Sequence, residues 1–379
     1  MEESATCFPG VLGHEAICGH LQRAIERGQL HHALVLAGPA GVGKETLARG
    51  LACALLCPEA KGRGCGRCPI CVRVLARNHP DLSYLTPSGP GGLIKIEDAR
   101  ACLIRQASAP YEADAHVIIV DPADALGDKS GNALLKAIEE PRPGVHWLLL
   151  SQNLHGLLPT ILSRALPIRM GRLPEPVVRQ ILSAQAPEVS EERRDMAALL
   201  AEGSAGEAVA LARDPVLERC LELLRHALAA AARGPVGIFS GDHAPLWSSW
   251  STAVEAAVAA HDAEDARARE AAAEPAVVKV DAKGKVKGKK GRAKAKKTTS
   301  KKAPAARQRE VATRLVDLWT LHIRQRLRDR PGLPGVPAIE RPPARLVRDL
   351  ERLRELEAQV RGNANVRLVV EQTLLELGP

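Results

Sequence analysis

The spacing of hydrophobic residues changes near residue 172. Before that point, short runs of β-branched and other apolar residues alternate with stretches that repeat apolar residues at helical spacing. This alternation is typical of βαβ units, in which parallel strands form a sheet that helices cover. The first three predicted strands each run into a polar or glycine-rich turn, the edge at which open α/β sheets bind ligands. The predicted strands are residues 33–36, 116–120, 147–150 and 166–170.

Beyond residue 172 the pattern is helical. The spacing of Val177, Ile181 and Leu182 predicts a small helical domain over residues 173–214. Apolar residues at the same spacing then predict a second helical domain over residues 215–379. The chain is thus predicted to have an α/β domain over residues 1–172, followed by two all-α domains.

The second helical domain is interrupted. Residues 262–309 are dominated by alanine, lysine, glutamate and glycine, without large apolar residues at a regular spacing. Such a segment buries too little apolar surface to offset the entropy of ordering it, so we expect a disordered insertion. It is also basic, because residues 279–309 hold 14 Lys or Arg and one acidic residue.

The net charge of +9 therefore belongs to the insertion, since the remaining chain has 39 basic and 43 acidic residues. Only eight aromatic residues occur, which argues against a protein that stacks single-stranded bases on aromatic side chains. No apolar run approaches the roughly 20 residues of a membrane span, and Glu2 and Glu3 do not fit a signal peptide. We expect a cytoplasmic protein without a membrane partner.

A glycine-rich segment follows the first predicted strand and opens a helix, as in a P-loop. Gly38, Gly41 and Gly43 allow backbone N–H groups to turn toward phosphates, and Lys44 can reach the terminal phosphates. A glycine-rich turn without a ligand is the alternative.

Two positions argue against hydrolysis at this site. A P-loop has Ser or Thr after the lysine to ligate magnesium, but here that residue is Glu45. Thr46 comes one residue too late, which rotates its hydroxyl by about 100° on a helix. Asp121 ends a buried strand as a Walker B aspartate does, yet Pro122 stands where a water-activating glutamate is usual. Asp121 can hold a metal-bound water or act only as a turn residue.

Four cysteines follow the pattern C-x7-C-x2-C-x2-C. Four thiolates with no open position describe a structural zinc site. An iron–sulfur cluster would accept the same ligands, but the short segment and the lack of a redox partner motif favour zinc. A chance group of free thiols is the weaker explanation for such clustering. The predicted ligands are Cys57, Cys65, Cys68 and Cys71.

Several segments together resemble the clamp-loader branch of the AAA+ family. The resemblance covers most of residues 8–215, and residues 363–377 match more loosely. It implies an AAA+ domain over residues 1–172 with a zinc module at residues 57–71, a helical lid over 173–214 and a helical collar over 215–379. The segments that carry it are VLGHE at residues 11–15, HALVLAG at 32–38, NHPD at 78–81, NALLKAIEEP at 132–141 and LPTILSR at 158–164.

The departures from the family are specific. Its ATPase subunits, gamma and tau, have Thr after the P-loop lysine, an Asp-Glu pair at Walker B and a Gly-Ser-x-Arg sensor. Here these positions hold Glu45, Pro122 and Gly206. That combination resembles the delta-prime type of subunit, which has often lost its own ATPase apparatus; bound ATP stays an open question.

The resemblance also implies roles and partners. It implies that Arg164, otherwise interpreted as a surface arginine, is an arginine finger acting in trans, with Ala165 in place of the family's usual cysteine. It implies that Asn153 stands at the first sensor position. The implied partners are gamma/tau and delta subunits in a hetero-pentamer, which loads the sliding clamp on primed DNA within the DNA polymerase III holoenzyme; the chain shows no polymerase residues of its own.

Two other functions remain open on the sequence. One is an active AAA+ ATPase of the gamma/tau type. The other is a zinc-containing DNA-binding protein, which the basic insertion favours, although charges in a disordered segment give only a salt-sensitive attraction without sequence preference.

Overall fold

The computed structural model describes residues 8–88, 92–232, 244–273, 303–329, 332–333, 336, 341–361 and 365–376. These residues form two compact units, Met1–Ala212 and Arg213–Pro379. The first contains a sheet, the helices that cover it and three further helices, and the second contains helices only in its described part. The predicted class, an α/β domain followed by helical domains, is confirmed.

The sheet of the first unit has five parallel strands. β1 lies between β4 and β5, where Ala33 is opposite Trp147 and Leu34 is opposite Leu166. Four of the five strands match the predicted ones, and β2 was not predicted. The order across the sheet is β2 (Leu82–Leu85), β3 (His116–Val120), β4 (Val145–Ser151), β1 (Ala33–Ala37) and β5 (Leu166–Arg169).

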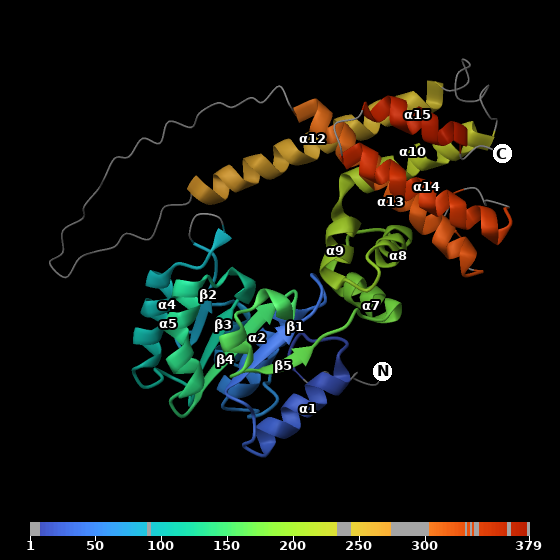
Figure 1. The fold of residues 1–379 in the computed structure, drawn as a ribbon. Helices are drawn as coiled ribbons and strands as arrows, with labels where there is room; N and C mark the ends of the chain where they lie inside the picture. Colours follow the sequence, from blue (N-terminus) through green and yellow to red (C-terminus); the bar gives the residue numbers. More distant parts are fainter. Residues whose placement is uncertain are drawn as a thin grey trace. The chain divides into compact units, whose positions relative to one another are not determined.

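Alternating side chains of β1 supply the two faces of the sheet. Leu34 and Leu36 belong to a core with α1, α2 and α3, while Val35 and Ala37 belong to a core with α4, α5 and α6. The buried sheet therefore lies between two helical layers (Figure 1). The first layer holds α1 (Glu15–Glu26), α2 (Lys44–Leu56) and α3 (Pro69–Leu75), and the second α4 (Ile96–Gln106), α5 (Asp128–Glu139) and α6 (Pro159–Leu162).

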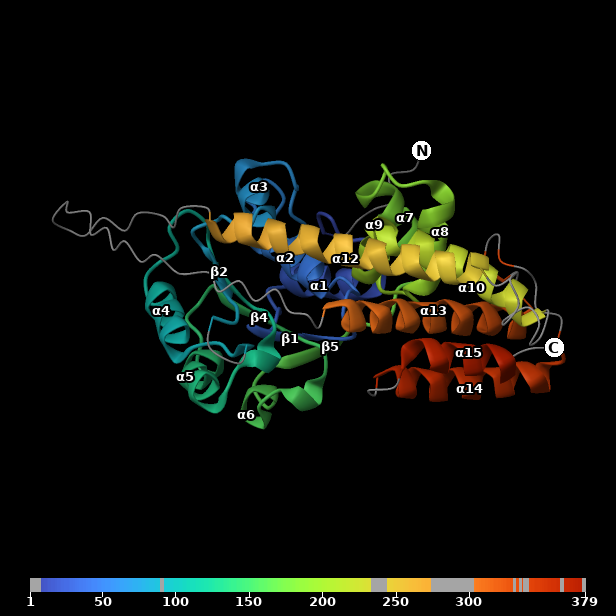
Figure 2. The same ribbon diagram turned by 90° about the horizontal axis from the view of Figure 1, so that it is seen from above.

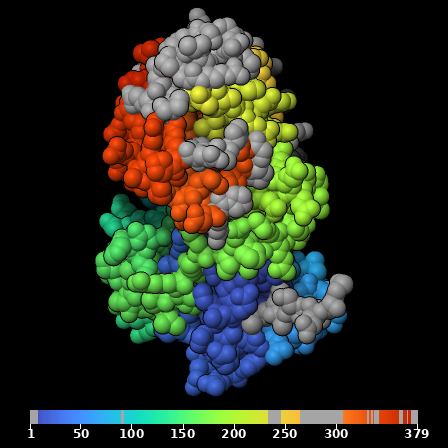
Figure 3. Space-filling view, turned by 90° about the vertical axis from the view of Figure 1, so that its right-hand side faces the viewer, coloured from blue at the N-terminus to red at the C-terminus, as the bar shows by residue number. Residues whose placement is uncertain are grey.

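Three helices after β5 form a lid within the same unit. They are α7 (Glu175–Gln185), α8 (Glu191–Leu200) and α9 (Ala205–Arg213). Ile181 and Leu182 lie on the buried side of α7, as their spacing predicts. Val178 is buried beside them, and Val177 is partly buried. Figure 3 shows lid residues, in light green, against N-terminal residues of the unit, in blue.

Long helices pack side by side in the second unit (Figure 2). At its start, the Asp214 carboxylate forms an ion pair of 2.6 Å with Arg314 of α13. Leu353, Leu356 and Val360 of α14 are buried, as their spacing predicts. The helices are α10 (Pro215–Ala232), α12 (Ala244–Ala273), α13 (Ala303–Leu327), α14 (Pro343–Arg361) and α15 (Val366–Glu376).

The predicted limits of the disordered insertion were wrong. α12 continues to Ala273 and α13 already begins at Ala303, so both ends of residues 262–309 are helical. Alanine, arginine and glutamate have high helix propensity, and adding turns to an existing helix is much easier than nucleating one. Residues 274–302 lie outside the described residues. None of the described helices has the length and apolar character needed to cross a membrane.

Candidate functional site

The P-loop segment lies between β1 and α2. Gly41 and Gly43 have φ values of +72° and +95°, in the left-handed region that glycine adopts without a Cβ clash. Lys44 begins α2, and its Nζ donates hydrogen bonds to the carbonyl oxygens of Gly38, at 2.8 Å, and Pro39, at 2.7 Å. Burial lowers the pKa of Lys44, although Asp121 and Asp124 act to raise it. A phosphate oxygen can replace these carbonyls as the acceptor.

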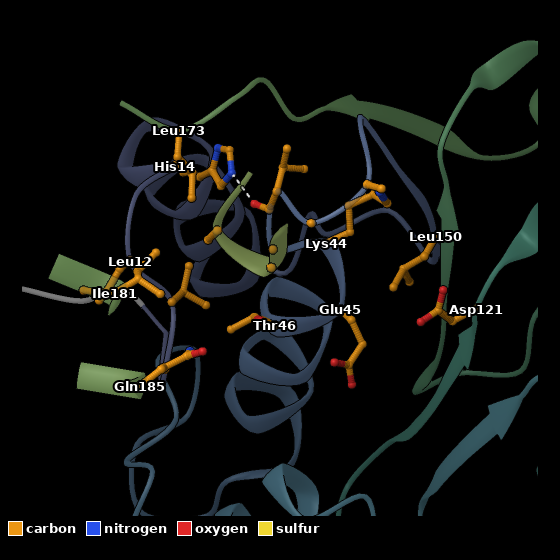
Figure 4. A pocket seen from close by; sticks show the side chains of 18 of the residues that line it. Leu12, His14, Lys44, Glu45, Thr46, Asp121, Leu150, Leu173, Ile181 and Gln185 are labelled. Atoms are coloured by element: carbon orange, nitrogen blue, oxygen red, sulfur yellow. Dashed lines mark hydrogen bonds between the residues drawn. The ribbon is translucent and has the colours of Figure 1, made fainter. Parts of the chain in front are cut away.

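A cavity of about 660 Å³ lies over this loop. Its lining comes from the P-loop, the N-terminal segment, the ends of β3 and β4, and the lid. Figure 4 shows Leu12, Ile181 and Gln185 at one end and Lys44 and Asp121 at the other. One end is therefore largely apolar, and the other offers charge and the amide groups of a glycine-rich turn.

The structure brings most of the predicted nucleotide residues together. Gly41, Gly43, Lys44, Thr46 and Asp121 all line the cavity.

The other two predicted nucleotide residues lie differently. Gly38 directly follows β1, and an added Cβ there would lie 2.3 Å from the Met170 carbonyl oxygen. Asn153 begins a short helix, and its Oδ1 accepts a hydrogen bond of 3.0 Å from the His155 N–H. The neighbouring Gln152 lines the cavity.

His14 and Gln185 are among the lining residues that were missing from the predicted site. The His14 Nε2 lies 3.0 Å from the carbonyl oxygen of Val42 and is the hydrogen-bond donor, as the dashed line in Figure 4 marks. Gln185 comes from α7. His14 belongs to the VLGHE segment and was within reach of motif reasoning, whereas the position of Gln185 depends on how the lid folds over the P-loop.

The lid also bonds directly to the P-loop. The Ser204 hydroxyl donates to the Ala40 carbonyl at 3.1 Å, and the Gly206 N–H donates to the Gly41 carbonyl at 2.9 Å. A Cβ at Gly206 would lie 3.1 Å from the Gly41 Cα, so a larger residue would press against the loop. Peptide C=O and N–H groups point in opposite directions. The lid therefore takes up the carbonyls and leaves the amides of this turn facing away from it.

Glu45 takes part in an ionic cluster. Its Oε1 accepts a hydrogen bond of 3.0 Å from the Nε of Arg77. The same oxygen forms ion pairs of 2.8 Å with the Nη2 of Arg77 and 2.9 Å with the Nε of Arg49. Arg49 also donates to the Leu75 carbonyl at 2.9 Å, and the Arg77 guanidinium lies 5.4 Å from the centre of the Tyr84 ring. The carboxylate at the usual magnesium position thus already has two cationic partners.

Asp121 lines the cavity beside these groups. Burial raises its pKa, and the charge of Glu45 raises it further, while Lys44 and Arg77 act against this shift.

The four predicted cysteine ligands form one cluster. All four sulfur atoms lie within 4.8 Å of one another, and the Cys57–Cys68 and Cys65–Cys71 pairs are each 3.9 Å apart. Zn–S bonds of about 2.3 Å in a tetrahedron require S–S distances of about 3.8 Å. The donor set therefore fits a structural zinc ion, in which no position is left open for catalysis.

Nearby backbone groups suit thiolates at this cluster. N–H groups of Ala60, Cys68 and Cys71 point at the sulfurs of Cys57, Cys65 and Cys68 over 3.2 to 3.4 Å. Burial raises the pKa of the neighbouring Cys53 to about 12, which keeps it a thiol.

Arg164 follows α6. Its Nη1 donates to the Thr160 carbonyl and the Ser163 hydroxyl, both at 3.1 Å, and its Nε lies 2.9 Å from Glu139. The guanidinium lowers the pKa of Glu139 through this contact. Arg164 does not line the described cavity of its own chain, and its side chain is about one third exposed.

The NHPD segment has a structural role. The Asp81 carboxylate is buried and accepts three backbone hydrogen bonds, from Tyr111 at 2.6 Å and from Glu112 and Ala113 at 2.9 Å. Burial acts to raise the pKa of Asp81, but these N–H groups outweigh it, so the pKa lies below its usual range.

Comparison with known proteins identifies the family. The family model described as DNA polymerase III, delta subunit, matches residues 13–174. A delta' subunit of DNA polymerase III from Pseudomonas aeruginosa is 31% identical over 234 residues, which are 60% of this chain and 67% of that protein. The chain belongs to the DNA polymerase III delta' family. The predicted resemblance is thereby confirmed.

Two further comparisons of this delta' family member give a shorter or a structurally weaker match. A gamma/tau subunit from Mycobacterium tuberculosis is 34% identical over 180 residues, 46% of this chain and 30% of that protein. A solved structure of a gamma-subunit-related protein from Thermotoga maritima is 16% identical and covers 95% of this chain and 97% of its own, with a TM-score of 0.39.

Proposed function

We propose that this chain is a clamp-loader subunit of the delta' type that does not hydrolyse ATP itself and supplies Arg164 to the ATP site of a neighbouring gamma or tau subunit. The complex would contain gamma/tau and delta subunits and load the sliding clamp on primed DNA. Membership of the delta' family supports the coarse assignment.

The observation that carries the proposal is the selective loss of hydrolytic groups. The magnesium, water-activating and second-sensor positions hold Glu45, Pro122 and Gly206, and none of them is the residue type that usually does that task. Glu45 forms ion pairs with two arginines, and the backbone N–H of Gly206 donates a hydrogen bond to the P-loop.

Arg164 has the properties that a finger acting in trans requires. It is partly exposed, it follows a helix that packs on the sheet domain, and it does not line the cavity described in its own chain. Its partner Glu139 is about half exposed, and exposed ion pairs contribute little free energy. The phosphate oxygens of a neighbouring ATP site can therefore replace the Glu139 carboxylate and accept two hydrogen bonds from the guanidinium.

Reconstitution with gamma or tau and delta subunits tests this role. Arg164→Ala should leave the complex assembled but slow its DNA-stimulated ATP hydrolysis by about 10³-fold, the loss expected where an arginine finger stabilises the transferred phosphoryl group. ATP turnover and clamp loading are measured on the same preparation.

Arg179→Ala is the matched control, because Arg179 is a half-exposed arginine of α7 paired with Glu175. It should leave turnover unchanged. Normal ATP hydrolysis by a complex that carries Arg164→Ala would show that Arg164 is not an arginine finger.

An active ATPase of the gamma/tau type is the alternative that the intact P-loop lysine favours. It predicts ATP hydrolysis by the isolated chain that Lys44→Ala abolishes. Our proposal predicts no such turnover above the background of the Lys44→Ala variant.

A further inference from the structure

The cavity of the first unit has the form of a nucleotide site although its magnesium position is changed. Val11, Leu12, Leu173 and Ile181 supply apolar surface for a flat base, and residues 41–44 supply a glycine-rich turn for phosphates. Because the lid bonds to the Ala40 and Gly41 carbonyls, the turn is held in one conformation.

At the magnesium position, the charged carboxylate of Glu45 stands where a P-loop usually has an uncharged hydroxyl. A free glutamate there would repel phosphate. The Glu45 carboxylate is instead neutralised by Arg49 and Arg77, at 2.9 and 2.8 Å. Two guanidinium groups against one carboxylate leave the cluster with one net positive charge. Lys44 adds another beside the turn, opposite the Asp121 carboxylate that also lines the cavity.

Both arginines are held in place by further contacts. Arg49 is anchored on the Leu75 carbonyl at the end of α3, and Arg77 lies over the Tyr84 ring. Glu45 therefore has little freedom to turn toward a cation, and its charge is already compensated. A magnesium ion would have to compete with both arginines for the Glu45 carboxylate.

We propose that this pocket binds a nucleoside diphosphate without a divalent cation, and that the Glu45–Arg49–Arg77 cluster supplies the compensating charge that magnesium supplies in a hydrolysing site. The proposal rests on the proposed function in one respect only, the absence of hydrolysis by this chain. It does not depend on the role of Arg164.

Calorimetric titration of the full-length chain with ADP tests it. One buffer contains excess magnesium, and the other is freed of divalent cations on a chelating resin, so that no soluble chelator competes for metal at the cysteine cluster. We expect the two dissociation constants to agree within about threefold, whereas a site that needs the cation would differ by tenfold or more.

Two variants separate the charge argument from simple occupancy. Glu45→Thr restores the usual hydroxyl and removes the carboxylate that the arginines hold, so magnesium should now strengthen ADP binding by about tenfold or more. Arg77→Gln leaves Glu45 with one cation fewer and should weaken binding in both buffers. Arg73→Gln is the matched control, because Arg73 lies on α3 four residues before Arg77 but pairs with Glu112, and should bind as the natural chain does.

Three outcomes would overturn the proposal: no binding of ADP in either buffer, a tenfold or greater gain from magnesium in the natural chain, or unchanged binding in Lys44→Ala. These results are independent of partner ATPase activity. Failure here therefore leaves the Arg164 measurement, and with it the proposed function, to be judged separately.

Discussion

Single residues in this chain keep the shape of a catalytic site and change its chemistry. Gly41 and Gly43 retain the turn that only glycine forms without strain, and Lys44 retains its position at the start of α2. Glu45 and Pro122 occupy the two positions at which a hydrolase holds its cation and activates water. Shape and chemistry are separable here because the backbone forms the cradle, whereas hydrolysis needs particular side chains.

The cysteine cluster gives a prediction at this scale. We expect one zinc ion per chain, measured by metal analysis of the purified protein, and loss of that ion in Cys68→Ser because four-coordinate zinc needs all four sulfurs. Cys102→Ser serves as the control, since Cys102 is a buried cysteine of α4 outside the cluster. Iron in place of zinc, or zinc retained by Cys68→Ser, would contradict the assignment.

Asp81 makes stability depend on pH in a defined direction. Asp81→Asn should lower the free energy of unfolding at pH 7 by about 2 kcal/mol, because the variant loses a charged acceptor for three buried N–H groups. The folded-state pKa of Asp81 is depressed, so its contribution is fully present above the unfolded value of about 3.9 and is lost as the pH falls through the folded value.

Urea unfolding of both proteins between pH 7 and pH 3 measures this contribution. The difference between them should be constant above about pH 5 and shrink at the acid end. A difference that grew toward low pH would show that the three backbone bonds do not hold the ionised carboxylate.

At the scale of elements, the close approach of β1 and β5 sets the start of the P-loop. The Met170 N–H donates to the Ala37 carbonyl at 2.7 Å, and the Met170 carbonyl oxygen fills the space that a side chain at Gly38 would need. The glycine at this position is therefore required by strand packing as well as by any ligand.

Gly38→Ala should destabilise the first unit by about 2 kcal/mol or more, because the added Cβ meets backbone that cannot rotate away. Gly171→Ala is the matched control: an added Cβ there has no atom of the described chain within 4 Å, and its φ is not in the left-handed region. Thermal unfolding of the two variants compares them directly. Equal midpoints would mean that β5 shifts without cost.

The elements also show what the sequence could predict. β1, β3 and β4 have long apolar runs because both faces of the sheet are covered, and such runs are recognisable without tertiary information. β2 is a four-residue edge strand, Leu-Ser-Tyr-Leu, which pairs only with β3 in the described sheet and carries too little pattern to be recognised. The helical ends around residues 262–309 were missed because helix propensity can extend a helix without an apolar face.

The candidate site divides in the same way. The P-loop and the four cysteines are each contiguous in the sequence and could be recognised from spacing. In the structure the P-loop lines the cavity with Asp121, and the cysteines form a separate cluster. The arginine partners of Glu45 were not predicted, because Arg77 reaches it from beyond α3, more than 30 residues away in the chain. Asn153 was assigned by its position in a motif, but its amide oxygen caps a short helix.

On the scale of the whole molecule, charge is distributed very unevenly. The basic residues at 279–309 outnumber the acidic ones by 14 to 1, while the rest of the chain is slightly acidic. A dense basic segment attracts nucleic acid through phosphates, without sequence preference and with steep dependence on salt. The packing of α10 with α12 and α13 does not need such charges, because it rests on buried residues such as Leu224, Ala253 and Leu315.

Deleting residues 281–302 should therefore leave the protein folded and clamp loading intact at low salt. The deletion removes 11 basic residues and one acidic residue. If this segment attracts DNA, the deletion variant should first load less well than the natural chain at intermediate salt, where the attraction in the natural chain is weakened but still present. Clamp loading on primed DNA is measured over a salt series with the reconstituted complex.

A variant in which these basic residues become glutamine has the same length and separates the effect of charge from that of chain connection. If the deletion abolishes loading at every salt concentration while the glutamine variant is active, the segment acts as a physical connection; if both are inactive, direct DNA binding by this segment is essential and the delta' assignment alone does not account for the function.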